Sequence, residues 1–147
     1  MPALVAFLGC EKVVVDQDSH TISVFSVIQD LNIPLPPGGA NIPHGAMAQF
    51  PWAGLTLWEM VPEDKGKAFE QKAQLTMEGE TLVESDPASF EMAKPSYRVI
   101  HRFLGFPIWR SGRCVLRLLL REVGQPEWRE IATYPIRVHH VAAGASD

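Results

Sequence analysis

Residues 67–77, KAFEQKAQLTM, alternate between apolar and polar side chains along most of their length. One side of an extended chain would carry Phe69, Ala73, Leu75 and Met77, and the other Glu70, Lys72, Gln74 and Thr76. A repeat of two residues is the pattern of a β-strand with one buried face, whereas a helix repeats every 3.6 residues. The stretch therefore predicts a half-buried strand, and it guides the interpretation of the rest of the chain.

Short apolar or alternating segments recur along the chain, with turn residues between them. We expect further strands at residues 4–10, 13–15, 22–28, 54–61, 81–84, 89–92, 97–104, 113–122 and 128–141. These ten segments, taken as about eight or nine short strands without a long helical repeat, are typical of an all-β fold, here an antiparallel β-sandwich. We expect one such domain over residues 1–141, a usual size for one core, and a disordered tail at 142–147.

Residues 113–122, RCVLRLLLRE, place Arg113, Arg117 and Arg121 four apart, which also suits a helix because leucine, arginine and glutamate are good helix formers. The strand-rich surroundings favour a strand.

Residues 33–45, IPLPPGGANIPHG, contain four prolines and three glycines, and they predict a long irregular loop.

Composition and charge exclude some classes of protein. The formal net charge of −4 argues against general binding to nucleic acid, which normally requires a basic surface. No stretch approaches the roughly 20 apolar residues of a membrane span, and residues 1–10 lack the basic start of a signal segment. Cys10 and Cys114 each lie in an apolar run. We therefore expect two buried, reduced thiols and a cytoplasmic protein, with a disulfide as the alternative.

An arginine-rich face is the most informative surface that the sequence suggests. If residues 97–104 and 113–120 pair as a hairpin, one face alternates arginines with aliphatic side chains, and no arginine lies directly opposite another. This candidate interface consists of Arg98, Ile100, Arg102, Val115, Arg117 and Leu119. Arginine beside exposed aliphatic groups is typical of protein interfaces. The alternative is a solvated face whose arginines pair with Glu91 and Glu130.

Residues 9–20, GCEKVVVDQDSH, bring a thiol, three carboxylates, a serine and a histidine into twelve positions. Cys10 and His20 would lie far apart along a strand, so the stretch predicts a strand that ends in an Asx-type turn rather than a catalytic thiol. Aspartates beside turns leave weak support for calcium, because no complete calcium-loop pattern is present. We expect no catalytic residue, no metal ligands and no cofactor, since phosphate-loop, nucleophile-elbow and zinc-helix motifs are absent.

Tryptophans near the expected strand ends suggest a second kind of site. Trp52, Trp109 and Trp128 flank proline or arginine and could form a part-exposed rim for a sugar or another small ligand. The favoured alternative is that they cap the open ends of the sandwich. His101 is expected to face the core as a hydrogen-bonded structural histidine.

The order of motifs along the chain carries a resemblance. A Cys-Glu strand start at residue 10 is followed by the Pro-rich loop, a Thr-Leu-Trp strand at 56–58 and the closing strand IATYPIRV at 131–138. In this order the chain resembles a family of small bacterial single-domain β-sandwich proteins of unknown function. The resemblance implies one compact domain and no transferable activity. We expect a non-enzymatic module that binds another protein or itself through the arginine-rich face or the loop at residues 33–45. Small-ligand binding is the alternative, and an enzyme using His101 or a loop carboxylate is a third hypothesis.

Overall fold

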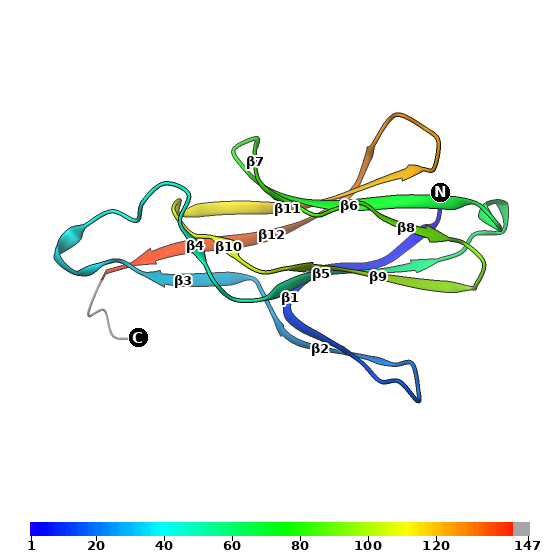
Figure 1. The fold of residues 1–147 in the computed structure, drawn as a ribbon, viewed down its shortest axis with the longest axis horizontal. Coiled ribbons are helices and arrows are strands. Elements are labelled where there is room, and N and C mark those ends of the chain that lie inside the picture. Colours follow the sequence, from blue (N-terminus) through cyan, green and yellow to red (C-terminus); the bar gives the residue numbers. More distant parts are fainter. Residues whose placement is uncertain (143–147) are drawn as a thin grey trace.

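Two β-sheets packed against each other make up most of the computed structural model, which describes residues 1–142 (Figure 1). Sheet A has the strand order β2-β1-β5-β9 and consists of β1 (Ala3–Val15), β2 (Ile22–Val27), β5 (Trp52–Glu59) and β9 (Ser96–Phe103). Sheet B has the order β3-β12-β11-β6-β7, with β8 also pairing β6, and consists of β3 (Asp30–Pro34), β6 (Ala68–Met77), β7 (Glu80–Glu84), β8 (Ala88–Glu91), β11 (Gly112–Glu122) and β12 (Arg129–Val141). The predicted all-β sandwich is confirmed, and sheet B curls into a half-barrel.

Several short elements were not predicted. β3 overlaps the start of the segment expected as a loop, and β4 (Met47–Ala48) pairs with β10 (Phe106–Pro107) in a small third sheet. Two 3-10 turns are formed by Pro37–Gly39 and Pro62–Asp64. All strand pairs are antiparallel except β3 with β12. Residues 1–142 include no helix with the length and apolar character needed to span a bilayer. The tail from residue 143 lies outside the described residues.

The alternation of residues 67–77 is realised in β6. Phe69, Ala73, Leu75 and Met77 are buried among the side chains between the sheets. β6 pairs with β11, which pairs on its other side with β12. Residues 113–122 are therefore a central strand of sheet B, and the helical alternative is excluded.

The predicted hairpin between residues 97–104 and 113–120 is wrong. β9 pairs with β5 in sheet A, whereas β11 pairs with β12 and β6 in sheet B. The connection crosses from one sheet to the other and carries Phe106 into the core. Residues 105–109, GFPIW, are too apolar to be left in water as a turn, so a buried crossing is favoured. The six residues of the candidate interface consequently do not share one face.

Candidate functional site

A hairpin formed by residues 12–27, here called the arm, is the most distinctive local feature. β1 pairs with β5 over Ala3–Cys10 and with β2 over Cys10–Val15. The alternation of buried and exposed side chains in β1 breaks at Glu11 and Lys12, which are exposed neighbours. Beyond this point β1 curls away, and the arm runs back along the outer face of sheet A (Figure 1).

The inner side of the arm covers an apolar patch on the outer face of sheet A. This cluster has four buried members and five partly buried ones: Cys10, Val13, Ala53 and Leu55, with Leu8, Ile22, Val24, Leu57 and Ile100. The other face of β5 packs against sheet B through Trp52 and Trp58. β5 is therefore buried on both faces, which explains why almost all of WAGLTLWE is inaccessible to solvent.

The tip of the arm is the Asx turn predicted from residues 16–20. The Oδ1 atom of Asp16 accepts hydrogen bonds from the backbone N–H groups of Asp18 at 2.9 Å and Ser19 at 2.8 Å. Hydrogen bonding, above all from the Ser19 backbone, holds the pKa of Asp16 below its ordinary value. His20 follows with a left-handed φ of 58°. The turn interpretation of this stretch is confirmed.

A groove of about 950 Å³ lies between the tip of the arm and the adjoining end of sheet A. The arm lines it with His20, Thr21 and Ile22, and the sheet lines it with Leu57, Glu59 and Arg98. Its volume falls in the range of small-ligand sites, roughly 300–1,000 Å³. The groove is therefore a candidate binding site, and it is larger than the cavity of about 520 Å³ beside Asp64.

Arg98 connects the two walls of this groove. Its Nη1 donates a hydrogen bond to the carbonyl of His20 at 2.6 Å. Within residues 1–142, neither Arg98 nor its groove neighbour Lys94 forms an ion pair. Arg117 and Arg121, by contrast, each pair with a glutamate. The groove thus contains two positive charges and one carboxylate, Glu59, and none of the three is ion-paired within residues 1–142.

The predicted interface residues on β11 lie on a different, ion-paired surface. Arg117 Nε is 2.6 Å from Glu130 Oε1, and its Nη1 donates to Gln74 at 3.2 Å. Val115 and Leu119 belong to the same strand, with Leu119 buried. The solvated alternative therefore fits this half of the set, with Glu130 as the acidic partner.

The other half of the predicted interface lies on β9. Ile100 is packed beneath the arm, Arg98 lines the groove, and Arg102 is exposed beyond it. Glu91, the second acid expected to pair with an arginine, forms no ion pair within the described part of the chain.

One tryptophan of the predicted ligand rim is a core residue. Trp52 is buried, stacks on Phe103 with ring centroids 4.2 Å apart, and donates its Nε1 hydrogen to the Gly105 carbonyl at 2.7 Å. The expectation of a part-exposed indole at position 52 is wrong. The cause is the crossing after β9, because it brings Phe106 and the Gly105 carbonyl over the ring.

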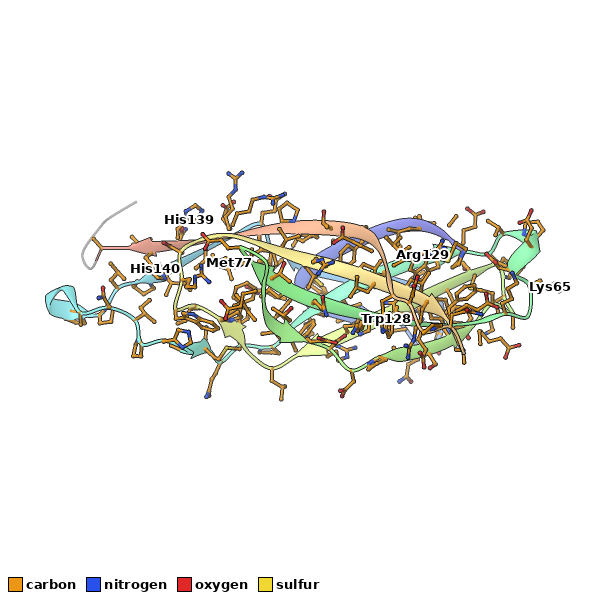
Figure 2. All side chains as sticks on the ribbon, turned by 90° about the horizontal axis from the view of Figure 1, so that it is seen from above. Lys65, Met77, Trp128, Arg129, His139 and His140 are labelled. Atoms are coloured by element: carbon orange, nitrogen blue, oxygen red, sulfur yellow. The ribbon has the colours of Figure 1, made fainter. Side chains whose placement is uncertain are left out.

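The remaining two tryptophans line none of the cavities described here. Trp109 is half-buried, with its ring centroid 5.3 Å from that of His44. Trp128 immediately precedes β12, next to Arg129 and away from His139 near the other end of the strand (Figure 2). Lys72 and Arg121 lie over the Trp128 ring, 4.7 Å and 4.3 Å from its centroid. Trp52, Trp109 and Trp128 therefore do not form a common rim.

A buried polar cluster joins the two sheets across the core. Gln71 of β6 is 0% exposed, and its Oε1 accepts a hydrogen bond from the Trp58 indole at 2.7 Å. Its Nε2 lies 2.9 Å from His101 Nε2 and 3.0 Å from Thr56 Oγ1. The prediction of His101 as a hydrogen-bonded core residue is confirmed. Gln71 was missed, although a glutamine in the apolar phase of residues 67–77 was the available signal.

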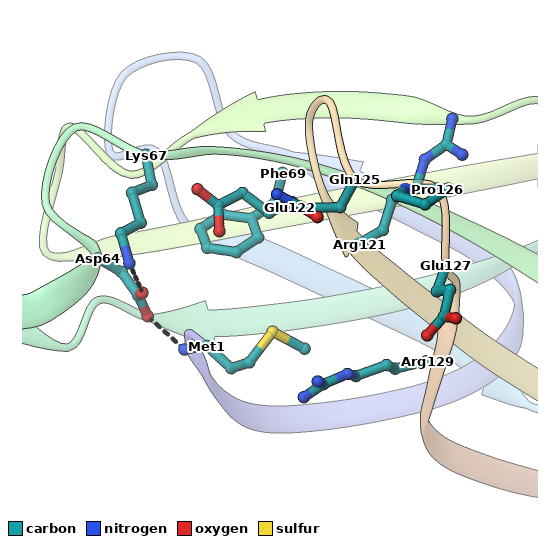
Figure 3. A pocket seen from close by; sticks show the side chains of 10 residues that line it. All are labelled: Met1, Asp64, Lys67, Phe69, Arg121, Glu122, Gln125, Pro126, Glu127 and Arg129. Atoms are coloured by element: carbon teal, nitrogen blue, oxygen red, sulfur yellow. Dashed lines mark ion pairs between the residues drawn. The ribbon is translucent and has the colours of Figure 1, made fainter.

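A second cavity, of about 520 Å³, is shown in Figure 3. The buried carboxylate of Asp64 lies 2.9 Å from the Met1 nitrogen and 3.5 Å from Lys67 Nζ. Cationic groups therefore already compensate this acid. Nowhere in residues 1–142 do three or more histidine, cysteine or acidic side chains form a group that could hold a metal ion.

Both cysteines are unpaired and buried, as predicted, but in different places. Cys114 belongs to the core between the sheets, whereas Cys10 lies beneath the arm. Burial raises the pKa of the Cys114 thiol to about 11 and also raises that of Cys10.

We expect native protein to resist a thiol reagent and to react at both cysteines in denaturant. Cys10→Ser and Cys114→Ser each leave a single thiol to follow. Local opening of the arm exposes only Cys10, so Cys10 should react faster than Cys114 in sub-denaturing urea. Equal rates would contradict an arm that opens independently, and immediate native labelling would contradict burial.

No protein-family model matches the chain, and a search of curated proteins also found no significant match.

Proposed function

We propose that the protein is a non-enzymatic, self-assembling β-sandwich module in which β2 pairs with β2 of a second copy. The observation that carries this proposal is the free edge of the arm. β2 ends the strand order of sheet A, and residues 21–29, TISVFSVIQ, contain neither charge nor proline. An edge of this kind offers unpaired backbone N–H and C=O groups to another strand.

The other long edges of the sandwich carry features that discourage pairing. β9 has Arg98 and Arg102, β7 begins and ends with glutamate, and β3 contains Asp30 and ends at Pro34. Charged residues and proline are the usual means by which natural proteins protect sheet edges. β2 lacks both, which supports its role as a pairing surface.

Exposed apolar side chains accompany this edge. Phe25 is 51% exposed, Val27 49% and Val14 39%. Burying them would add apolar contact to backbone hydrogen bonding. A second copy is the favoured partner because an uncharged strand is self-complementary: antiparallel pairing about a two-fold axis places no like charges opposite each other.

We expect light scattering coupled to size exclusion to give a dimer mass at both low and moderate salt. Salt stability follows because the contact consists of backbone hydrogen bonds and apolar side chains, which ionic screening hardly weakens. Phe25→Lys combined with Val27→Lys should yield a monomer. These side chains are exposed, so each substitution should change the free energy of unfolding of the monomer by no more than about 0.5 kcal/mol, about 1 kcal/mol for the pair. Any further, concentration-dependent loss comes from the lost dimer.

Leu104→Lys provides the matched control. Leu104 is 87% exposed but lies outside the arm, so its substitution should leave the dimer mass unchanged. A wild-type chain that remains monomeric at high concentration would overturn the proposal. A dimer that survives both lysine substitutions in the arm would assign the contact to another surface.

A further inference from the structure

The charges around the groove beneath the tip of the arm are unbalanced. Arg98 and Lys94 bring two positive charges to its lining, and Glu59 is the acidic residue there. None of these three side chains takes part in an ion pair among residues 1–142. A half-buried guanidinium without a carboxylate partner favours an anion from outside the protein.

The guanidinium is also held in place before any ligand arrives. Arg98 donates one N–H to the His20 carbonyl at 2.6 Å. That carbonyl belongs to the arm tip, which the hydrogen bonds to Asp16 hold in its turn conformation. Because the remaining N–H groups of the fork keep their direction, little side-chain entropy is lost when they bind an anion.

The walls of the groove are not purely polar. Val5, Ile22, Leu57 and Tyr97 add apolar surface to the same lining as the charged residues. Val5 is 62% exposed where β1 has a bulge between Leu4 and Ala6, so it remains available for contact. A simple inorganic anion would leave this surface uncovered, whereas an anion attached to an apolar group would bury it.

We propose that the groove between the arm tip and sheet A binds a small organic carboxylate with an apolar body. The carboxylate accepts hydrogen bonds from Arg98 and is attracted by Lys94, and the apolar body lies along Val5, Ile22 and Leu57. Glu59 opposes the anion and so limits the affinity. The site uses the inner side of the arm, including Ile22, rather than the free edge of β2, so its test does not depend on self-assembly.

The first experiment compares three probes that share one apolar chain. Decanoate and decylammonium below their micelle concentrations, and 1-decanol below its solubility limit, are titrated into wild-type protein by isothermal calorimetry. We expect decanoate to bind about tenfold or more tightly than the other two, as a charge-assisted hydrogen bond predicts. Equal affinity for decanoate and decanol, or a preference for decylammonium, would overturn the proposal.

Substitutions then locate the anion. Arg98→Gln should weaken decanoate binding about tenfold or more, and Lys94→Gln several-fold. Glu59→Gln should strengthen binding, because it removes the opposing charge. Arg102→Gln is the matched control: Arg102 lies on the same strand and is exposed, but it lies outside the groove. Unchanged affinity in the Arg98 and Lys94 variants, or a loss in Arg102→Gln equal to that in Arg98→Gln, would overturn the assignment.

Arg98→Gln could also weaken binding by loosening the arm. Lys94→Gln separates the two effects because Lys94 makes no hydrogen bond to the arm in the described chain. The labelling rate of Cys10 in each variant reports whether the arm remains closed. Decanoate affinity that falls only where Cys10 becomes reactive would contradict direct contact with the anion.

Discussion

Replacing Gln71 by leucine is expected to lower the free energy of unfolding by about 3 kcal/mol, although the two side chains have similar size. Gln71 is fully buried and is the partner of both the Trp58 indole and His101. Leucine would leave these two polar groups without a hydrogen bond in the core. Thr56 would keep its bond to the Val99 carbonyl at 3.2 Å. The loss comes from unpaired buried groups rather than from a cavity.

Urea unfolding followed by tryptophan fluorescence measures this loss. The matched control is Gln74→Leu on the same strand, because Gln74 bonds to Glu84 and Arg117 on the solvated face of sheet B. Water can replace those partners, so the control should lose less than about 1 kcal/mol. Equal losses of the free energy of unfolding in the two variants would mean that the buried cluster contributes no more to stability than the exposed hydrogen bonds of Gln74.

Acidification is expected to destabilise the protein through His101, between pH 6.5 and about pH 4. The indole of Trp58 can only donate, so it orients Oε1 of Gln71 toward itself and the Nε2 amide group toward His101. His101 must therefore accept at Nε2 and remain neutral. A protonated ring would place two donors against each other inside the core.

Burial lowers the pKa of His101 from 6.5 to about 4. The unfolded chain therefore takes up a proton near pH 6.5, whereas the folded chain does so only near pH 4. The stabilising contribution is complete above pH 6.5 and is lost as the pH falls through this window. Its size is about 3 kcal/mol across the whole interval.

His101→Gln isolates this contribution because glutamine offers an acceptor to Gln71 and does not titrate. We expect wild-type stability to fall about 3 kcal/mol further than that of the variant between pH 6.5 and 4. Parallel pH profiles would show that His101 is not responsible. The four other histidines, which lie outside this cluster, remain in both proteins and cancel in the comparison.

The sequence predicted individual parts of the candidate site but not their arrangement in space. The Asx turn at residues 16–20 was predicted because it depends on local hydrogen bonds between neighbours. Arg98 was identified as a candidate contact residue, but on a face shared with β11 that does not exist. The groove could not be predicted, since it requires β1 to curl after Cys10 and bring residue 20 beside residue 98.

The local character of the strands was determined by the sequence alone. The alternation in residues 67–77 specifies one buried face in any fold, because side chains of an extended chain alternate in direction. Only the tertiary structure decided which strands pair. β9 and β11 carry matching patterns, yet burial of the apolar connection between them separates the two strands into opposite sheets. The arm over sheet A and the bridge from Gln71 to His101 arise in the same way, from contacts between residues distant in the chain that no local pattern encodes.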